Sequence, residues 1–170
     1  MTGLLSSLTQ IALLRKDPGS LPSSAGSVAF FVLLFAAADV LIIWLDVNDR
    51  PVLRTVLDVA IALSFVGLLL ALAGRIHRFP QTMIAILGTD LLLTPPVIVL
   101  LLLRSPARSN HAIALFSTAS MVLVVIWYLL IVGHILRSAL DTGLVTGFAI
   151  AVAWWFAAHA ISVTLFGAPP

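Results

Sequence analysis

The chain of 170 residues contains no cysteine and no glutamate, and only 9% of its residues are charged. The absence of cysteine excludes disulfides, thiol nucleophiles and cysteine-ligated metals. The sequence also lacks a His-Glu-x-x-His zinc motif, a phosphate-binding loop and a Gly-x-Ser-x-Gly nucleophile motif. We therefore expect a protein that is not an enzyme and that has no catalytic residue, cofactor or metal.

Apolar residues make up 61% of the chain. Soluble domains contain about a quarter charged and under half apolar residues, so this composition indicates a membrane protein. A spanning helix needs about 20 mostly apolar residues. We expect an all-α polytopic membrane protein, a single membrane domain over residues 1–170, with five transmembrane helices at about 27–45, 52–73, 82–103, 113–136 and 144–166.

Polar turns separate these spans, at 46–51, 74–80, 104–110 and 137–143. In the last turn, Asp141 or Thr142 is expected to cap the fifth span, because short polar side chains satisfy the first amides of a helix. The net charge of +2 comes from basic residues scattered at the ends of the spans, where membrane proteins keep them. This distribution does not indicate a nucleic-acid partner.

A short apolar stretch at 3–16 precedes the first span, with leucines and an isoleucine at helical spacing. It is too short to cross a bilayer. We predict an N-terminal amphipathic helix, which either lies on the membrane surface or packs on the inner face of the bundle.

The orientation follows from the basic residues between the spans. With the N-terminus inside, five basic residues are cytoplasmic and four are external, a small excess in the direction that membrane proteins prefer. The cytoplasmic set is Arg15, Lys16, Arg75, Arg78 and Arg137, and the external set is Arg50, Arg54, Arg104 and Arg108. Arginine-rich, glutamate-free composition hints at a bacterium, so we predict the bacterial inner membrane, with a cytoplasmic N-terminus and a periplasmic C-terminus.

Charged residues inside the spans are costly, by at least about 2.5–3.5 kcal/mol each, and need an explanation. Asp39 and Asp58 both lie about 9 Å from the outer end of their spans, by the rise of about 1.5 Å per residue. Arg54 precedes Asp58 by one helical turn. We predict a polar cluster of Asp39, Arg54 and Asp58, in which Arg54 bridges the carboxylates. It would either join the first two spans or hold a proton or cation.

Asp90 lies near the middle of the third span, and two prolines follow it. Pro95 and Pro96 remove the hydrogen bonds to the carbonyls of residues 91 and 92, so we expect the helix to kink or break there. Broken helices beside a carboxylate form the midplane ion sites of transporters. The alternative is that neighbouring threonines and helices satisfy these polar groups.

The histidines are spread along the chain. His134 ends the fourth span and His159 lies late in the antiparallel fifth, so their depths differ too much to share one haem iron. His111 and His159 could both lie near the outer surface with Asp39 and Asp58, but two histidines without a third ligand are a weak metal signal.

Gly143, Gly147 and Ala151 recur at four-residue spacing in the last span. Such a stripe of small residues lets another helix approach closely. The partner helix belongs either to the same bundle, to a second copy of the chain or to another integral membrane protein.

Several segments together resemble bacterial members of the Ypt-interacting-protein (Yip) membrane family. They are the amphipathic stretch 4–16, the segment 74–90 with the prolines that follow, Trp127, and the segment 133–140. The resemblance implies an N-terminal surface helix, five spans and a membrane adaptor or scaffold function. It implies no catalytic residues.

Short loops, missing catalytic motifs and the small-residue stripe favour a membrane adaptor, assembly factor or accessory subunit of a membrane complex. Its partners would be the lipid bilayer and another integral membrane protein or a second copy of itself. One alternative is a small ion- or proton-coupled transporter or channel that uses Asp90 beside the Pro95-Pro96 break. Another is a lipid-handling protein that uses the N-terminal helix.

Overall fold

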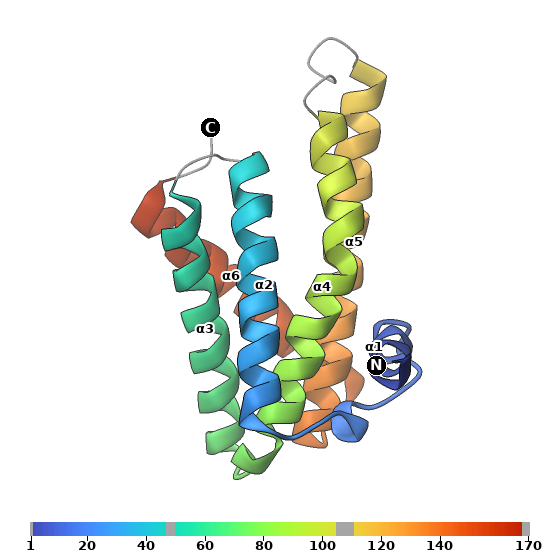
Figure 1. Cartoon of the computed structure of the whole chain (residues 1–170), viewed down its shortest axis with the longest axis vertical. Helices are drawn as coiled ribbons and strands as arrows, with labels where there is room; N and C mark the ends of the chain where they lie inside the picture. Colours follow the sequence, from blue (N-terminus) through green and yellow to red (C-terminus); the bar gives the residue numbers. More distant parts are fainter. Residues whose placement is uncertain (1, 47–49, 105–110, 168–170) are drawn as a thin grey trace.

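The computed structural model describes residues 2–46, 50–104 and 111–167, which form six α-helices and two short 3-10 helices (Figure 1). The α-helices are α1 (Thr2–Ala12), α2 (Ala25–Asp46), α3 (Pro51–Leu72), α4 (Phe79–Arg104), α5 (His111–Leu140) and α6 (Leu144–Phe166). The 3-10 helices are η1 (Pro18–Ser20) and η2 (Ile76–Arg78).

Five of these helices, α2 to α6, are long and apolar enough to cross a membrane. The predicted all-α polytopic fold is therefore confirmed, and each helix begins and ends within a few residues of its predicted range. Large apolar side chains such as Leu33, Leu72 and Val145 are more than two-thirds exposed. In lipid this exposure is favourable, whereas in water it would be costly. The turn predicted at 104–110 lies outside the described residues from position 105 onward, and Arg108 is therefore not described.

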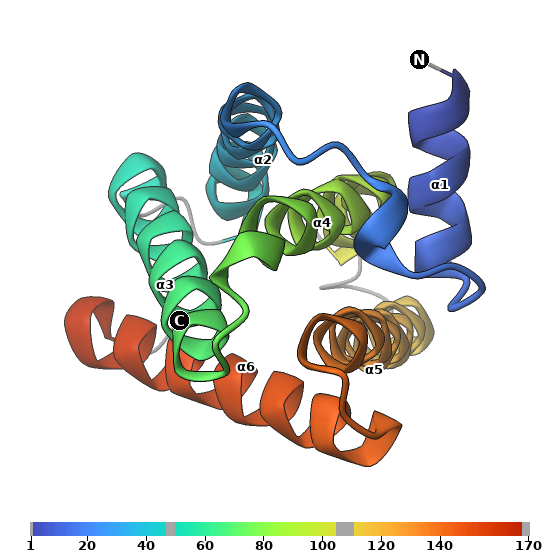
Figure 2. The same ribbon diagram turned by 90° about the horizontal axis from the view of Figure 1, so that it is seen from below.

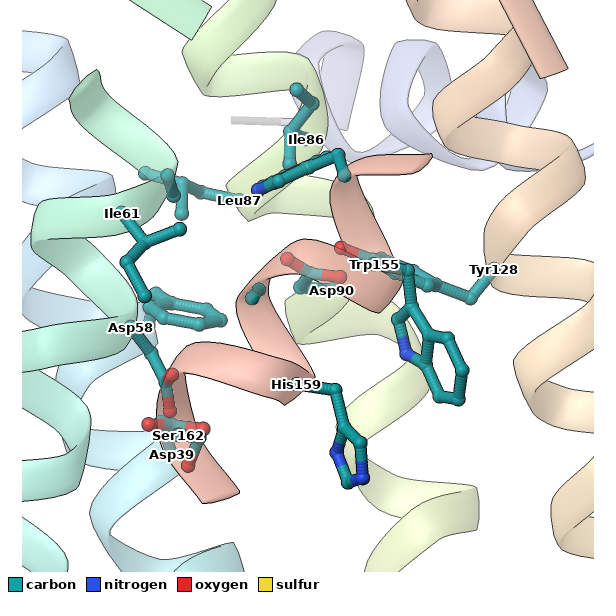
Figure 3. A pocket seen from close by; sticks show the side chains of 14 residues that line it. Asp39, Asp58, Ile61, Ile86, Leu87, Asp90, Tyr128, Trp155, His159 and Ser162 are labelled. Carbon is teal, nitrogen blue, oxygen red and sulfur yellow. The ribbon is translucent and has the colours of Figure 1, made fainter. Parts of the chain in front are cut away.

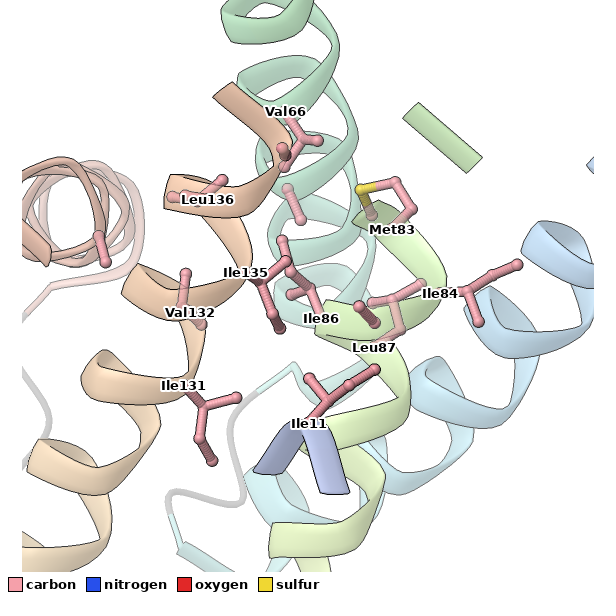
Figure 4. Packing of buried hydrophobic residues seen from close by; sticks show 14 of the residues in the cluster. Ile11, Val66, Met83, Ile84, Ile86, Leu87, Ile131, Val132, Ile135 and Leu136 are labelled. Carbon is pink, nitrogen blue, oxygen red and sulfur yellow. The ribbon is translucent and has the colours of Figure 1, made fainter. Parts of the chain in front are cut away.

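Helix α4 lies at the centre of the bundle, and Figure 2 shows the other helices arranged around it. Every residue from Thr82 to Thr89 is buried. Figure 4 shows how Met83, Ile86 and Leu87 of α4 pack among apolar residues of α1, α3 and α5. This central helix therefore presents its later residues, including Asp90, to several neighbours at once.

Helix α1 lies across the bundle axis and packs on α4 (Figures 1 and 2). Its residues Leu8 and Ile11 are fully buried. Gly88 of α4 makes this contact possible, because a Cβ atom there would lie 2.6 Å from the Leu8 side chain. Of the two predicted alternatives, the structure thus has α1 packed on the bundle, with Leu5 still exposed.

Of the two outcomes predicted for the third span, a kink or a break, the break was wrong. Helix α4 continues through Pro95 and Pro96 to Arg104. Two prolines remove only two backbone hydrogen bonds, whereas unwinding the helix in lipid would leave many more groups unsatisfied. The hydroxyl of Thr94 donates to the Asp90 carbonyl at 3.1 Å, so this threonine is satisfied within the helix.

The predicted cap of the last helix was also wrong. Gly143 occupies the N-cap position of α6, and no side chain caps the helix there. Asp141 instead accepts hydrogen bonds from Arg75 and from Arg78. Two arginines compete better for a carboxylate than backbone amides do, because both partners are charged.

The small-residue stripe lies partly inside the bundle. Gly147 and Ala151 are buried, and Gly147 faces α5, where a Cβ atom would lie 2.8 Å from the Cβ of Arg137. Gly133 of α5, which the stripe did not include, lies against the backbone of Phe148. Gly143 is exposed, and a Cβ atom there would meet no side chain or neighbouring helix within 4 Å.

Candidate functional site

An acidic cavity of about 360 Å³ lies among helices α2 to α6, at the level where α6 crosses the bundle. Figure 3 shows the side chains that surround it. Its polar lining residues are Asp39, Asp58, Asp90, Tyr128, His159 and Ser162. The cavity thus joins the two sites that were predicted separately, the outer polar cluster and the midplane aspartate.

The three aspartates come from three different helices, α2, α3 and α4, and each is half-buried. No lysine or arginine is among the described residues that line the cavity. Carboxylates inside a bilayer are costly without counter-charge, so this arrangement has the chemistry to hold protons or a cation.

Asp39 has a partner that was not predicted. The hydroxyl of Thr55 on α3 donates to the Asp39 carboxylate at 2.7 Å, which joins α2 to α3. The Arg54 guanidinium lies 4.6 Å from the ring centre of Phe166 on α6. The bridge from Arg54 to the carboxylates stays a prediction.

A second cavity, of about 490 Å³, adjoins the first between α2, α4 and α5. The two cavities share Phe35, Asp39, Asp90, Tyr128 and Trp155. The second continues along α2 to Asp46, the last residue of that helix. Asp39 and Asp46 are seven residues apart and so lie on one face of α2. The second cavity therefore extends the acidic cavity toward the end of the bundle where α2 ends, with Asp46 at its far end.

Helix α6 supplies site residues that the sequence analysis did not assign. Trp155, His159 and Ser162 all line the acidic cavity. Their spacing of four and then three residues places them on one helical face. This spacing was the pattern in the sequence that could have indicated that they belong to one site. The Trp155 ring stacks on His159, with 5.8 Å between ring centres and 6° between planes.

Trp154 is the buried aromatic wall of the same cavity. It is 7% exposed and stacks on Phe65 of α3, with ring centres 5.2 Å apart and planes at 5°. Among the described residues, no group accepts a hydrogen bond from its buried indole nitrogen. An unsatisfied buried donor costs about 1–3 kcal/mol. The nitrogen has almost no accessible surface, so the cavity meets the ring of Trp154 and not its N–H.

His134 lies apart from the cavity and holds the segment after α1. Its Nδ1 accepts from Arg137 Nε, and its Nε2 lies 3.2 Å from the Lys16 carbonyl. Because Nδ1 accepts, Nε2 carries the proton and donates to Lys16. His111 is exposed at the start of α5. Within the described residues, no three acidic or histidine side chains are close enough to hold one metal ion.

A functional proposal for this protein rests on the geometry of the cavity, because comparison with known proteins found no match. No protein-family model, no curated protein and no solved structure matches the chain.

Proposed function

We propose that this protein is a membrane carrier that binds a positively charged solute in the acidic cavity and exchanges it for protons. One observation carries the proposal: Asp39, Asp58 and Asp90, from three helices, line a single cavity. Arg54 can offset one of these charges at most. A proton on a carboxylate and a bound cation neutralise the same charge, so binding one releases the other.

Proton release tests the proposal. Purified protein in weakly buffered detergent, with a pH indicator dye, is titrated with sodium, potassium and small organic ammonium salts. We expect at least one cation to release protons, and Asp90→Asn to reduce the release strongly. Asp17→Asn is the matched control, because Asp17 is exposed and outside the cavity. Proton release that is absent for all the cations, or equal in the wild type and Asp90→Asn, would refute a coupled carrier.

The membrane adaptor predicted from the sequence is the second candidate function, and it stays a prediction. One feature that favoured it was the small-residue stripe, but Gly147 faces α5 of the same chain. The Yip resemblance, the bacterial inner membrane and the cytoplasmic N-terminus also stay predictions. They rest on the residues given above and do not depend on the carrier proposal.

A further inference from the structure

The walls of the acidic cavity are aromatic as well as acidic. Phe35, Tyr128, Trp154 and Trp155 line it, from α2, α5 and α6. Aromatic faces attract organic cations through their negative quadrupole, and quaternary ammonium groups are commonly bound in this way. Small metal ions instead need several oxygen ligands at short range. The described carboxylates do not gather closely enough for that.

Trp154 gives the cavity a fixed aromatic wall. Its side chain is 7% exposed, and stacking on Phe65 keeps the ring from turning freely. The indole nitrogen has almost no accessible surface, so a ligand in the cavity would meet the ring and not the N–H. The aromatic rings and the aspartates are independent features, and together they favour an organic cation.

We propose that the cavity binds an organic ammonium cation, with the aspartates balancing its charge. Trp155 would lie beside the cationic group, since this residue lines both cavities together with Asp39 and Asp90. A volume of about 360 Å³ is at the small end of the range for ligand pockets, which favours a small amine. This inference rests on the proposed carrier function and names its substrate class.

Calorimetric titration of the detergent-solubilised protein with three probes tests the proposal. The probes are choline, tetramethylammonium and potassium, at equal ionic strength. We expect choline and tetramethylammonium to bind, and potassium not to bind measurably. Trp155→Leu should weaken both organic cations at least tenfold, whereas Trp44→Leu, an exposed tryptophan outside both cavities, should change neither.

Because Trp155→Leu could fail to fold, Trp155→Phe serves as the second variant and should retain binding of both organic cations. Equal affinity of the organic cations for the wild type and Trp155→Leu would overturn the assigned role of the aromatic wall.

The outcomes separate the two proposals. If potassium or sodium releases protons through Asp90 while no organic cation binds, the substrate class is wrong and the carrier proposal stands. If no cation binds or releases protons, both are wrong.

Ammonium groups also occur on lipid headgroups, so a last experiment adds phosphatidylcholine or phosphatidylglycerol to the micelles. Displacement of choline by phosphatidylcholine alone would identify a headgroup as the source, whereas no displacement by either would identify a free amine.

Discussion

At the scale of single residues, the exposed carboxylate of Asp141 connects the end of α5 to the link between α3 and α4. Arg75 and Arg78, in the link between α3 and α4, both donate to it. Arg78 also donates to the carbonyls of Ser138 and Ala139 near the end of α5. The hydrogen bonds from Arg78 and Arg75 lower the pKa of Asp141 below its ordinary value of 3.8.

A lowered carboxyl pKa gives a stability contribution with a defined pH dependence. The contribution is fully present above the unfolded value of 3.8, and it is lost as the pH falls through the lower folded value. We expect Asp141→Asn to lower the thermal unfolding midpoint in detergent at neutral pH. The gap to the wild type should narrow as the pH is lowered below 3.8. A gap that stays constant into acid would show that the charge of Asp141 is not responsible, and Asp17→Asn gives the background effect of losing an exposed aspartate.

The acidic residues of the cavity could be found from the sequence, because a charge in an apolar run stands out. Asp39, Asp58 and Asp90 were all singled out in this way. Trp154 and Trp155 were not, because aromatic residues are common in spans and nothing in their pattern shows which neighbour they face. Their position depends on how α6 crosses the bundle, which tertiary packing decides.

At the scale of elements, the contact between α5 and α6 depends on two glycines. A Cβ atom on Gly133 would lie 2.8 Å from the Cα of Phe148, and one on Gly147 would lie 2.9 Å from the backbone nitrogen of Arg137. Backbone atoms cannot move aside as the end of a side chain can. This crossing therefore fixes the position of α6, and with it the aromatic wall of the cavity.

Gly133→Ala is expected to destabilise the protein by about 1–3 kcal/mol, because the added methyl group forces the two helices apart. Gly67→Ala is the matched control, since its new Cβ would lie 3.6 Å from the Phe79 ring, an ordinary contact. We expect Gly67→Ala to be neutral or to stabilise by up to about 1 kcal/mol. Unfolding in mixed micelles with increasing sodium dodecyl sulfate measures both. Equal stability of the two variants would contradict a close glycine contact.

The ends of the helices were predictable because each follows from the length of an apolar run and the polar turn after it. The break at Pro95-Pro96 was predicted wrongly, because the rule that proline ends helices holds for chains in water. In lipid, a helix that loses two hydrogen bonds is still the least costly backbone. The cap by Asp141 failed for a different reason, since its arginine partners lie more than 60 residues earlier in the chain.

At the scale of the whole molecule, the union of the two predicted sites into one cavity could not be derived from the sequence. Depth along a helix can be estimated from the rise per residue, but the estimate assumes upright helices. Helix α6 crosses the bundle obliquely, as Figures 1 and 2 show, and it lines the cavity across from α2 and α3. Helix tilt and rotation are set by packing between neighbours, and one sequence does not reveal them.

The orientation of the bundle gives a prediction for the entire chain. Five crossings place the link before α2 and the link between α5 and α6 on one side, and the start of α5 on the other. The chain has no cysteine, so single-cysteine variants report one position each. In intact bacterial spheroplasts, an impermeant maleimide should label Ala112→Cys, and it should label Ser23→Cys and Thr142→Cys only after lysis. Labelling in the opposite pattern would reverse the predicted orientation, and labelling of Ser23→Cys and Ala112→Cys from the same side would contradict the alternation of the spans.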